Sequence, residues 1–247
     1  MNNQRGNPEL VTFERTDIKP PYIVQAALEF VLHFQIKRDY LKDIFRLIRN
    51  SKHWNMQTLE INIKNWIKEF PEYESKDIIL ELVSKWFSMC KNDQDIKDLR
   101  GTLVESFVMA YVRKKHKING NGINIGWGAN VTIHPSSGNE MTVYYTCTTS
   151  PKPEGACRNR STVDIGIWDG HHGEFYECKV NPFWIGCSEM KYMDKLNRIL
   201  SDCGISHDIF FGFVVSNDAA TMQIADYDTD FKFQLIGAEE LSDTLSA

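Results

Sequence analysis

Residues 161–180 read STVDIGIWDGHHGEFYECKV and combine two apolar runs with a turn signal between them. Val163, Ile165 and Ile167 alternate with polar or small residues, which is typical of a strand that buries one face. A second apolar run follows the Asp-Gly pair. The stretch therefore predicts a β-hairpin with strands at 161–168 and 174–180.

The register of this hairpin brings two acids together. If Gly170 and His171 form a two-residue turn, Trp168 faces Gly173 and Asp164 faces Glu177. Opposed residues have Cβ atoms about 4.5–5.5 Å apart, and like charges at that separation are destabilising unless a cation lies between them. A hard divalent cation with oxygen ligands is the expected occupant.

Two further charged residues belong to the same candidate site. Lys179 lies on the same strand face as Glu177, where its ammonium can reach a water or phosphoryl oxygen beside the cation. Glu105 interrupts the apolar stripe of a helical segment, RGTLVESFVMAYV at 100–112. A buried carboxylate of this kind requires a partner.

The elements around the hairpin predict the fold class. A helix is expected at 98–117, strands at 123–133, 141–147 and 208–215, and a helix at 188–203. Together with the hairpin this gives the order α-β-β-β-α-β. Such an order implies an α/β (α+β) domain with a mixed central sheet flanked by helices.

The first part of the chain is helical throughout. Helical periodicity starts at Pro20 and Pro21 and returns at 39–49, 56–70 and 75–90, the last with Ser75 as N-cap. The polar stretch KNDQDIKD at 91–98 is expected to separate this module from the rest. We therefore predict a helical module at 1–95 for partner binding or dimerisation, with a core that includes Trp66, Phe70, Trp86 and Phe87, and a second domain at 96–247 with an acidic C-terminal tail.

The helical Glu105, the strand Asp164 and the sequence Glu177-Cys178-Lys179 resemble the PD-(D/E)xK nuclease superfamily, which has a restriction-endonuclease-like fold. The resemblance covers roughly residues 98–215. The family's proline before the first aspartate is Val163 here.

The resemblance implies a catalytic role for each of these residues. Asp164, Glu177 and the backbone carbonyl of Cys178 would hold Mg²⁺, which Mn²⁺ could replace, and Glu105 would bind the ion directly or through water. Lys179 would orient or activate the attacking water. The implied reaction is hydrolysis of phosphodiester bonds in DNA.

Basic residues near the hairpin are candidates for substrate contacts. Lys191 and Lys195 lie one turn apart on the helix at 188–203, where a solvated face is the alternative reading. Arg158 and Arg160 belong to the polar loop at 148–160, which is either a connection or a contact to DNA. A zinc site built from His134, His171, His172, Cys147 and Cys157 is a weaker alternative, because the spacings are irregular.

Composition limits the function classes. The 247 residues carry a net charge of −5, which argues against nonspecific nucleic-acid binding, although the excess acid lies in residues 218–247. No apolar stretch approaches the roughly 20 residues of a membrane span, the polar opening lacks signal-peptide features, and the six cysteines form no C-x-x-C pair. We expect a cytoplasmic protein with reduced cysteines.

Three functions remain open at this stage. The first is the nuclease component of a bacterial anti-phage or restriction system, which would act on DNA. A helicase or other ATPase is its expected protein partner, and a homodimer is an alternative assembly. The second is a stand-alone restriction endonuclease with its own cleavage sequence. The third is a non-catalytic interaction subunit whose carboxylates are a relic or a structural cation site.

Overall fold

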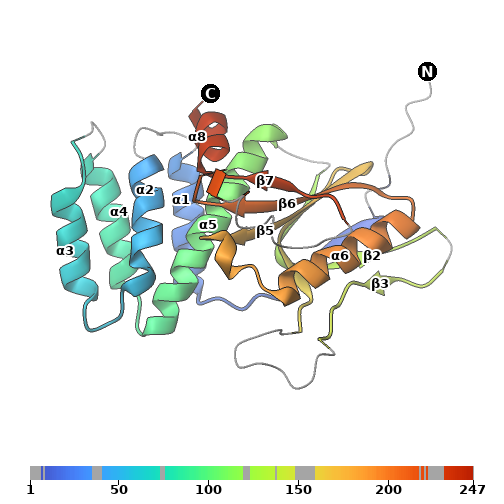
Figure 1. Ribbon diagram of the computed structural model, residues 1–247, viewed down its shortest axis with the longest axis horizontal. Helices are drawn as coiled ribbons and strands as arrows, with labels where there is room; N and C mark the ends of the chain where they lie inside the picture. The colour runs from blue at the N-terminus through green and yellow to red at the C-terminus, as the bar shows by residue number, and fades with distance from the viewer. Residues whose placement is uncertain are drawn as a thin grey trace.

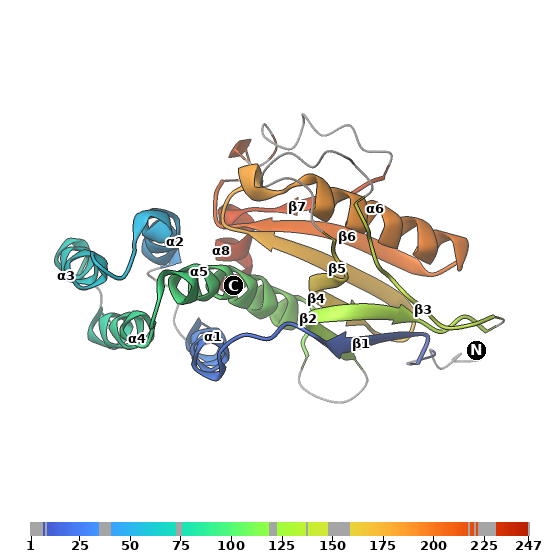
Figure 2. The ribbon, with the colours of Figure 1, turned by 90° about the horizontal axis from the view of Figure 1, so that it is seen from below.

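The structure is a computed structural model that describes residues 7, 9–34, 41–72, 76–118, 123–136, 138–147, 159–216, 218–219, 221 and 231–246. It is an α+β protein in which helices flank one mixed sheet (Figure 1). Helices α1 to α4 lie together at one end of the molecule, and α6 runs beside β6 at the other, as Figure 2 also shows.

Within the described residues, seven strands form the sheet in the order β1-β2-β4-β5-β6-β7, and β3 pairs with β2 outside this path. The pairs β1·β2, β2·β4 and β4·β5 are antiparallel, whereas β6 is parallel to β5 and β7 is parallel to β6. The strands are β1 Val11–Arg15, β2 Asn124–Ile133, β3 Met141–Thr142, β4 Thr162–Trp168, β5 His172–Lys179, β6 Ser206–Phe213 and β7 Gln234–Ile236.

Helix α5, Asp93–Lys115, is the central helix of the fold. Its N-cap Asn92 accepts a hydrogen bond from the backbone N–H of Asp95 at 2.9 Å, and basic residues in its last turn suit the helix dipole. Every residue from Thr102 to Val112 is buried. The helix begins five residues before the predicted start at 98, so the expectation that KNDQDIKD is a separating linker is wrong.

The N-terminal helices do not stand apart from α5, because α1, α2 and α4 pack on it and α3 packs on α4. They are α1 Pro21–Phe34, α2 Leu41–Asn50, α3 Leu59–Glu69 and α4 Lys76–Ser88, with a 3₁₀ turn, η1, at Ser51–His53. Trp66, Phe70, Trp86 and Phe87 are buried, which confirms their assignment to the core. Ser75, the predicted N-cap, lies outside the described residues.

Two hydrophobic clusters cover the two faces of the sheet. The first joins the N-terminal helices and α5 to sheet residues such as Ile165, Tyr176 and Phe210. The second joins α6, Cys187–Asp202, to Phe175 and Phe211. Residues adjacent in sequence alternate between the two clusters, as expected for strands with both faces buried.

The sequence missed three elements and overextended one. β1 pairs with β2 although it lies in the segment assigned to the helical module, and β7 and α8, Ala238–Ser246, form part of the predicted acidic tail. The strand expected at 141–147 ends at Thr142, with one further bridge between Tyr145 and Arg160. Short edge strands carry too little alternation to be recognised locally.

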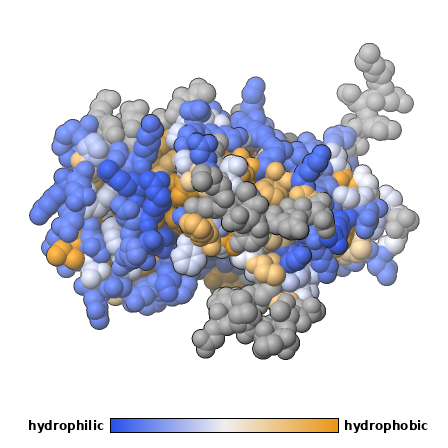
Figure 3. Space-filling view, in the orientation of Figure 1, coloured by the Kyte–Doolittle hydropathy of each residue, from blue (hydrophilic) through white to orange (hydrophobic). Residues whose placement is uncertain are grey.

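The surface over the N-terminal helices is mainly hydrophilic in the view of Figure 3. Among the described residues, no helix has both the length and the apolar character that crossing a membrane requires.

Candidate functional site

The hairpin of β4 and β5 has the predicted register. Trp168 pairs with Gly173, and the ladder continues to Ile165 and Tyr176. Just beyond this pair, the Asp164 carboxylate accepts a hydrogen bond of 2.7 Å from the backbone N–H of Cys178. The hairpin thus brings Asp164 beside the Glu177-Cys178-Lys179 segment, as its alternation and turn predicted.

Arg160 lies between the two acids of the hairpin. Its Nη2 atom is 3.2 Å from Asp164 Oδ1 and also pairs with Glu177 Oε2. The side chain of Glu177 is fully buried, and that of Arg160 is only 15% exposed. The Arg160 guanidinium therefore bridges both carboxylates and supplies countercharge that allows the two acids to lie side by side.

Lys179 completes this ion-pair network from the end of β5. Its ammonium pairs with Glu177 and lies 3.7 Å from Glu189 Oε1, and Glu189 is also 3.4 Å from Arg160 Nη1. Burial opposes the charge on Lys179, but the carboxylates of Glu177 and Asp164 outweigh it and raise its pKa. Lys179 is therefore held in its protonated form.

Glu105 reaches the site from helix α5, which belongs to the first hydrophobic cluster. It is buried on α5, where Lys19 Nζ lies 2.7 Å from its Oε2 atom and Trp127 Nε1 donates to the same oxygen at 2.7 Å. Burial raises the pKa of Glu105, and the nearby Asp164 adds to that effect while Lys19 opposes it. The expected partner of this carboxylate is thus a lysine from the segment between β1 and α1.

The three carboxylates differ in how readily they ionise. Burial raises the pKa of Glu177 to about 7, against the opposing effect of Arg160. Burial alone would raise the pKa of Asp164 as well, but Lys179, Arg160 and the Cys178 N–H together hold it below the usual value. Asp164 is therefore the most strongly ionised member of the three.

Two of the three acids, Glu105 and Asp164, line one cleft, whereas the buried Glu177 does not. Glu105, Asp164, Cys178 and Lys179 line a cleft of about 660 Å³, whose other lining residues are Lys52, His53, Lys97, Arg100, Gly101, Val180 and Trp184. The ligand atoms of Glu105, Asp164 and Glu177 do not all lie within 4.8 Å of one another. The expected convergence around one ion is thus incomplete while Arg160 and Lys19 lie among the carboxylates.

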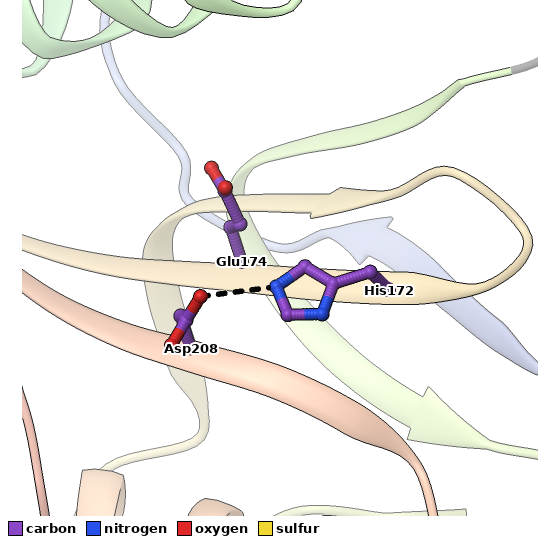
Figure 4. A group of neighbouring side chains, drawn as sticks. All are labelled: His172, Glu174 and Asp208. Carbon is purple, nitrogen blue, oxygen red and sulfur yellow. Dashed lines mark hydrogen bonds and ion pairs between the residues drawn. The ribbon is translucent and has the colours of Figure 1, made fainter.

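A second cluster among the described residues is more compact. One ligand atom each from His172, Glu174 and Asp208 lies within 4.8 Å of the others (Figure 4). His172 Nε2 is 3.1 Å from Asp208 Oδ2, so β5 and β6 are joined at this point.

Existing partners satisfy this second cluster. Glu174 is bound by Lys115 Nζ at 2.8 Å, by His116 Nε2 at 2.8 Å and by the Tyr176 hydroxyl. Burial raises the pKa of Glu174, but the hydrogen bonds from these partners outweigh that effect, so its pKa is lower than usual. Charge pairing between α5 and the sheet accounts for the cluster, so we do not assign it as a metal site.

Several predicted substrate residues lie elsewhere. Lys191 and Lys195 are exposed on α6 and do not line the cleft, and Lys195 donates to the Tyr144 carbonyl at 2.6 Å. Arg160 forms ion pairs with three carboxylates, those of Asp164, Glu177 and Glu189. It is therefore part of the candidate site, and not a contact to the DNA backbone as expected. Arg158 lies outside the described residues.

The zinc alternative gains no support. Cys157 lies outside the described residues, and His134, His171 and Cys147 do not join His172 in its cluster. The other described cysteines are free thiols, as expected for a protein without a disulfide framework.

Three residues of the site were missed. Lys19 and Trp127 contact Glu105, and Glu189 contacts Arg160 and Lys179. Glu189 has a local signal, since it lies at the third position of α6 and caps the Gly186 N–H. Nothing in the local sequence distinguishes Lys19 or Trp127.

Comparisons with known proteins do not identify the chain. No family model matches it, and no curated protein matches it. One solved structure with a similar arrangement is the crystal structure of protein VC1899 from Vibrio cholerae, at 12% sequence identity and a TM-score of 0.40. The match covers 96% of this chain and 57% of that one, and it is too weak to support an argument about function.

Proposed function

We propose that the protein is a metal-dependent nuclease that hydrolyses phosphodiester bonds of DNA. The observation that carries this proposal is the placement of Asp164, Glu105, the Cys178 backbone and Lys179 around one cleft. A structural ion-pair cluster has no need of a cleft, whereas a hydrolytic site must admit both substrate and water. The restriction-endonuclease-like arrangement of the core is part of this proposal.

The donor set fits a hard divalent cation. Carboxylate and backbone carbonyl oxygens are the ligands that Mg²⁺ prefers, and Glu105, Asp164, Glu177 and Cys178 would provide them. Arg160 stands in for a cation between Asp164 and Glu177, and Lys19 does so beside Glu105. When bound, Mg²⁺ would neutralise charge on the phosphoryl oxygens and lower the pKa of a water molecule.

The chain's own residues would position the reactants. Lys179 is protonated and faces the cleft, so its ammonium can orient the attacking water and stabilise charge on a phosphoryl oxygen. In hydrolysis the water oxygen bonds to phosphorus, the bond to the leaving sugar oxygen breaks, and that oxygen takes a proton. Glu189 and Glu177 hold Lys179 in place as positioning residues.

The test is cleavage of supercoiled plasmid DNA by the purified chain in Mg²⁺ and in EDTA. Asp164→Asn should abolish cleavage, whereas Glu60→Gln, at a side chain that is 83% exposed on α3, should cleave like the wild type. Cleavage that persists in EDTA or in Asp164→Asn would contradict the proposal. The expected defence role and the helicase partner remain predictions, because no contact in the structure bears on them.

A further inference from the structure

Two adjacent aromatic side chains are exposed beside the candidate site. Phe183 is 73% exposed and Trp184 is 66% exposed, and Trp184 also lines the cleft. Large aromatic side chains are normally buried, so two that share one exposed turn call for a ligand. The turn begins three residues after Lys179, and Trp184 and Lys179 line the same cleft, so that ligand would lie beside the candidate site.

The turn that presents these aromatics is held firmly. It is the 3₁₀ turn η2, Pro182–Trp184, and the Asn181 side chain caps it by accepting from the Phe183 N–H at 2.9 Å. Pro182 and Ile185 are buried on either side and anchor the turn. The exposed rings are therefore a pre-formed surface, and binding to it needs little ordering of the chain.

Basic side chains line the same cleft from other elements. Lys52 and His53 come from η1, and Lys97 and Arg100 come from α5. Arg100 Nε donates to the Ile48 carbonyl at 3.2 Å, and no carboxylate of the described residues forms an ion pair with Arg100. A half-buried guanidinium without an acidic partner favours an anionic ligand.

The helix also leaves room in the cleft. A Cβ atom at Gly101 would meet no atom within 4 Å, so no packing contact requires glycine at this interior position of α5. Glycine destabilises a helix interior relative to alanine and is used where a ligand approaches the backbone closely. Gly101 lines the cleft between Arg100 and Glu105.

We propose that the cleft receives an unpaired DNA strand, with a base stacked on Trp184 and its phosphates contacted by Arg100, Lys97 and Lys52. This inference rests on the proposed nuclease function and names its substrate class. Stacking on an aromatic platform combined with a basic groove is how proteins bind single strands without sequence preference.

The size of the cleft favours a single strand over a duplex as its ligand. Its volume of about 660 Å³ is in the range of small-ligand sites, which suits a single terminal or extruded nucleotide. A base can offer its face to Trp184 only after it has left the base-pair stack. A protein partner is the competing occupant, but the cationic wall favours a polyanion over a neutral or basic surface.

The test is fluorescence anisotropy of labelled oligonucleotides with the full chain in EDTA, where no metal-dependent cleavage occurs. The probes are a single strand, a blunt duplex of the same sequence, and an abasic strand that keeps every phosphate. The single strand should bind more tightly than the duplex or the abasic strand. Trp184→Ala should weaken single-strand binding roughly 5- to 150-fold, and it should leave abasic-strand binding unchanged.

Matched controls separate stacking from charge. Ile61→Ala removes another exposed apolar side chain, on α3, and should have no effect. Lys97→Ala should weaken all three probes and reduce the salt dependence of binding, with a slope change of about 0.7 for one phosphate contact on a single strand, whereas Lys64→Ala should not.

The outcomes distinguish this inference from the nuclease proposal. If the duplex binds as well as the single strand, or if Trp184→Ala binds all probes normally, the inference is overturned even where plasmid cleavage occurs. If single-strand binding depends on Trp184 but nothing is cleaved in Mg²⁺, the binding site stands and the nuclease proposal fails. If no probe binds, the aromatic turn belongs to a protein interface and the inference fails.

Discussion

The guanidinium of Arg160 and the carboxylate of Glu177 form an ion pair in which the acid is fully buried. The same Nη2 atom contacts Asp164, so Arg160 lies where the proposed metal would be expected to neutralise charge. Two carboxylates would otherwise be buried close together without sufficient countercharge. Arg160 and a divalent cation should therefore compete for these oxygens.

Arg160→Met should lower the free energy of unfolding in EDTA by about 3–5 kcal/mol, because it removes one partner of a buried pair. Mg²⁺ should restore part of this loss and should raise the melting temperature more in the variant than in the wild type. Thermal unfolding with and without Mg²⁺ measures both effects. Arg198→Met, at a side chain that is 61% exposed, is the control and should change little. A variant as stable as the wild type in EDTA would show that Arg160 does not serve this role.

Lys179→Met should slow DNA hydrolysis roughly 10²- to 10⁴-fold, because it removes the group that positions and activates the water. Mg²⁺ binding, measured by calorimetry, should persist because Lys179 is not a metal ligand. Lys64→Met, at a side chain that is 65% exposed, should hydrolyse DNA normally. Unchanged hydrolysis in Lys179→Met would favour the alternative of a structural, non-catalytic carboxylate cluster.

Glu174→Gln should weaken the pH dependence of stability on the acid side. The pKa of Glu174 is lowered in the folded protein, so its stabilisation is present above the ordinary carboxyl pKa and is lost as pH falls through the folded value. The wild type should therefore lose stability below about pH 4.5 more steeply than the variant. At pH 7 the variant should be less stable by about 1–3 kcal/mol, since it loses charged hydrogen bonds to Lys115 and His116.

Urea unfolding between pH 3 and 7 would measure these slopes. Glu140→Gln, whose side chain is 72% exposed, is the matched control. Parallel curves for wild type and Glu174→Gln would mean that Glu174 titrates alike in the folded and unfolded states.

Gly101→Ala should stabilise the protein by about 0.5–1 kcal/mol, because alanine is the better helix former and no atom opposes its Cβ. The same change should weaken single-strand binding by filling the cleft. Gly204→Ala is an instructive comparison: its Cβ would also meet nothing, but the backbone φ is +66°. That variant should be destabilised by about 1–2 kcal/mol. Chemical denaturation measures the stability of both variants, and fluorescence anisotropy measures single-strand binding. A loss of stability in Gly101→Ala would contradict the prediction.

The hairpin could be predicted because its signals are local. Alternation with period two and a turn at Gly170 fix which residues pair, and a slip of one residue would move every side chain to the opposite face of the sheet. Glu105 could be identified for a similar reason, since a single acid interrupts an apolar helical stripe. The mixed sheet flanked by helices followed from the order of these elements.

The partners of the acids could not be predicted. Lys19 lies 86 residues before Glu105 in the sequence, and β1 brings that segment to the site only by pairing with β2. Arg160 was assigned to DNA because it belongs to a polar loop, yet it folds back onto three carboxylates. The prediction of a linker at 91–98 was wrong for a related reason. Its polar residues provide the N-cap and the first turns of α5, and most of the buried residues of that helix come later.

The sequence by itself determined which residues carry the acidic and basic groups and which strand positions bring Asp164 beside Glu177, because periodicity and turn chemistry act between neighbours in the chain. Only the tertiary structure decided which cations neutralise those acids and that Lys52, His53 and Trp184 line the cleft with them. Contacts of that kind depend on how distant elements pack, and packing is settled by the whole core at once.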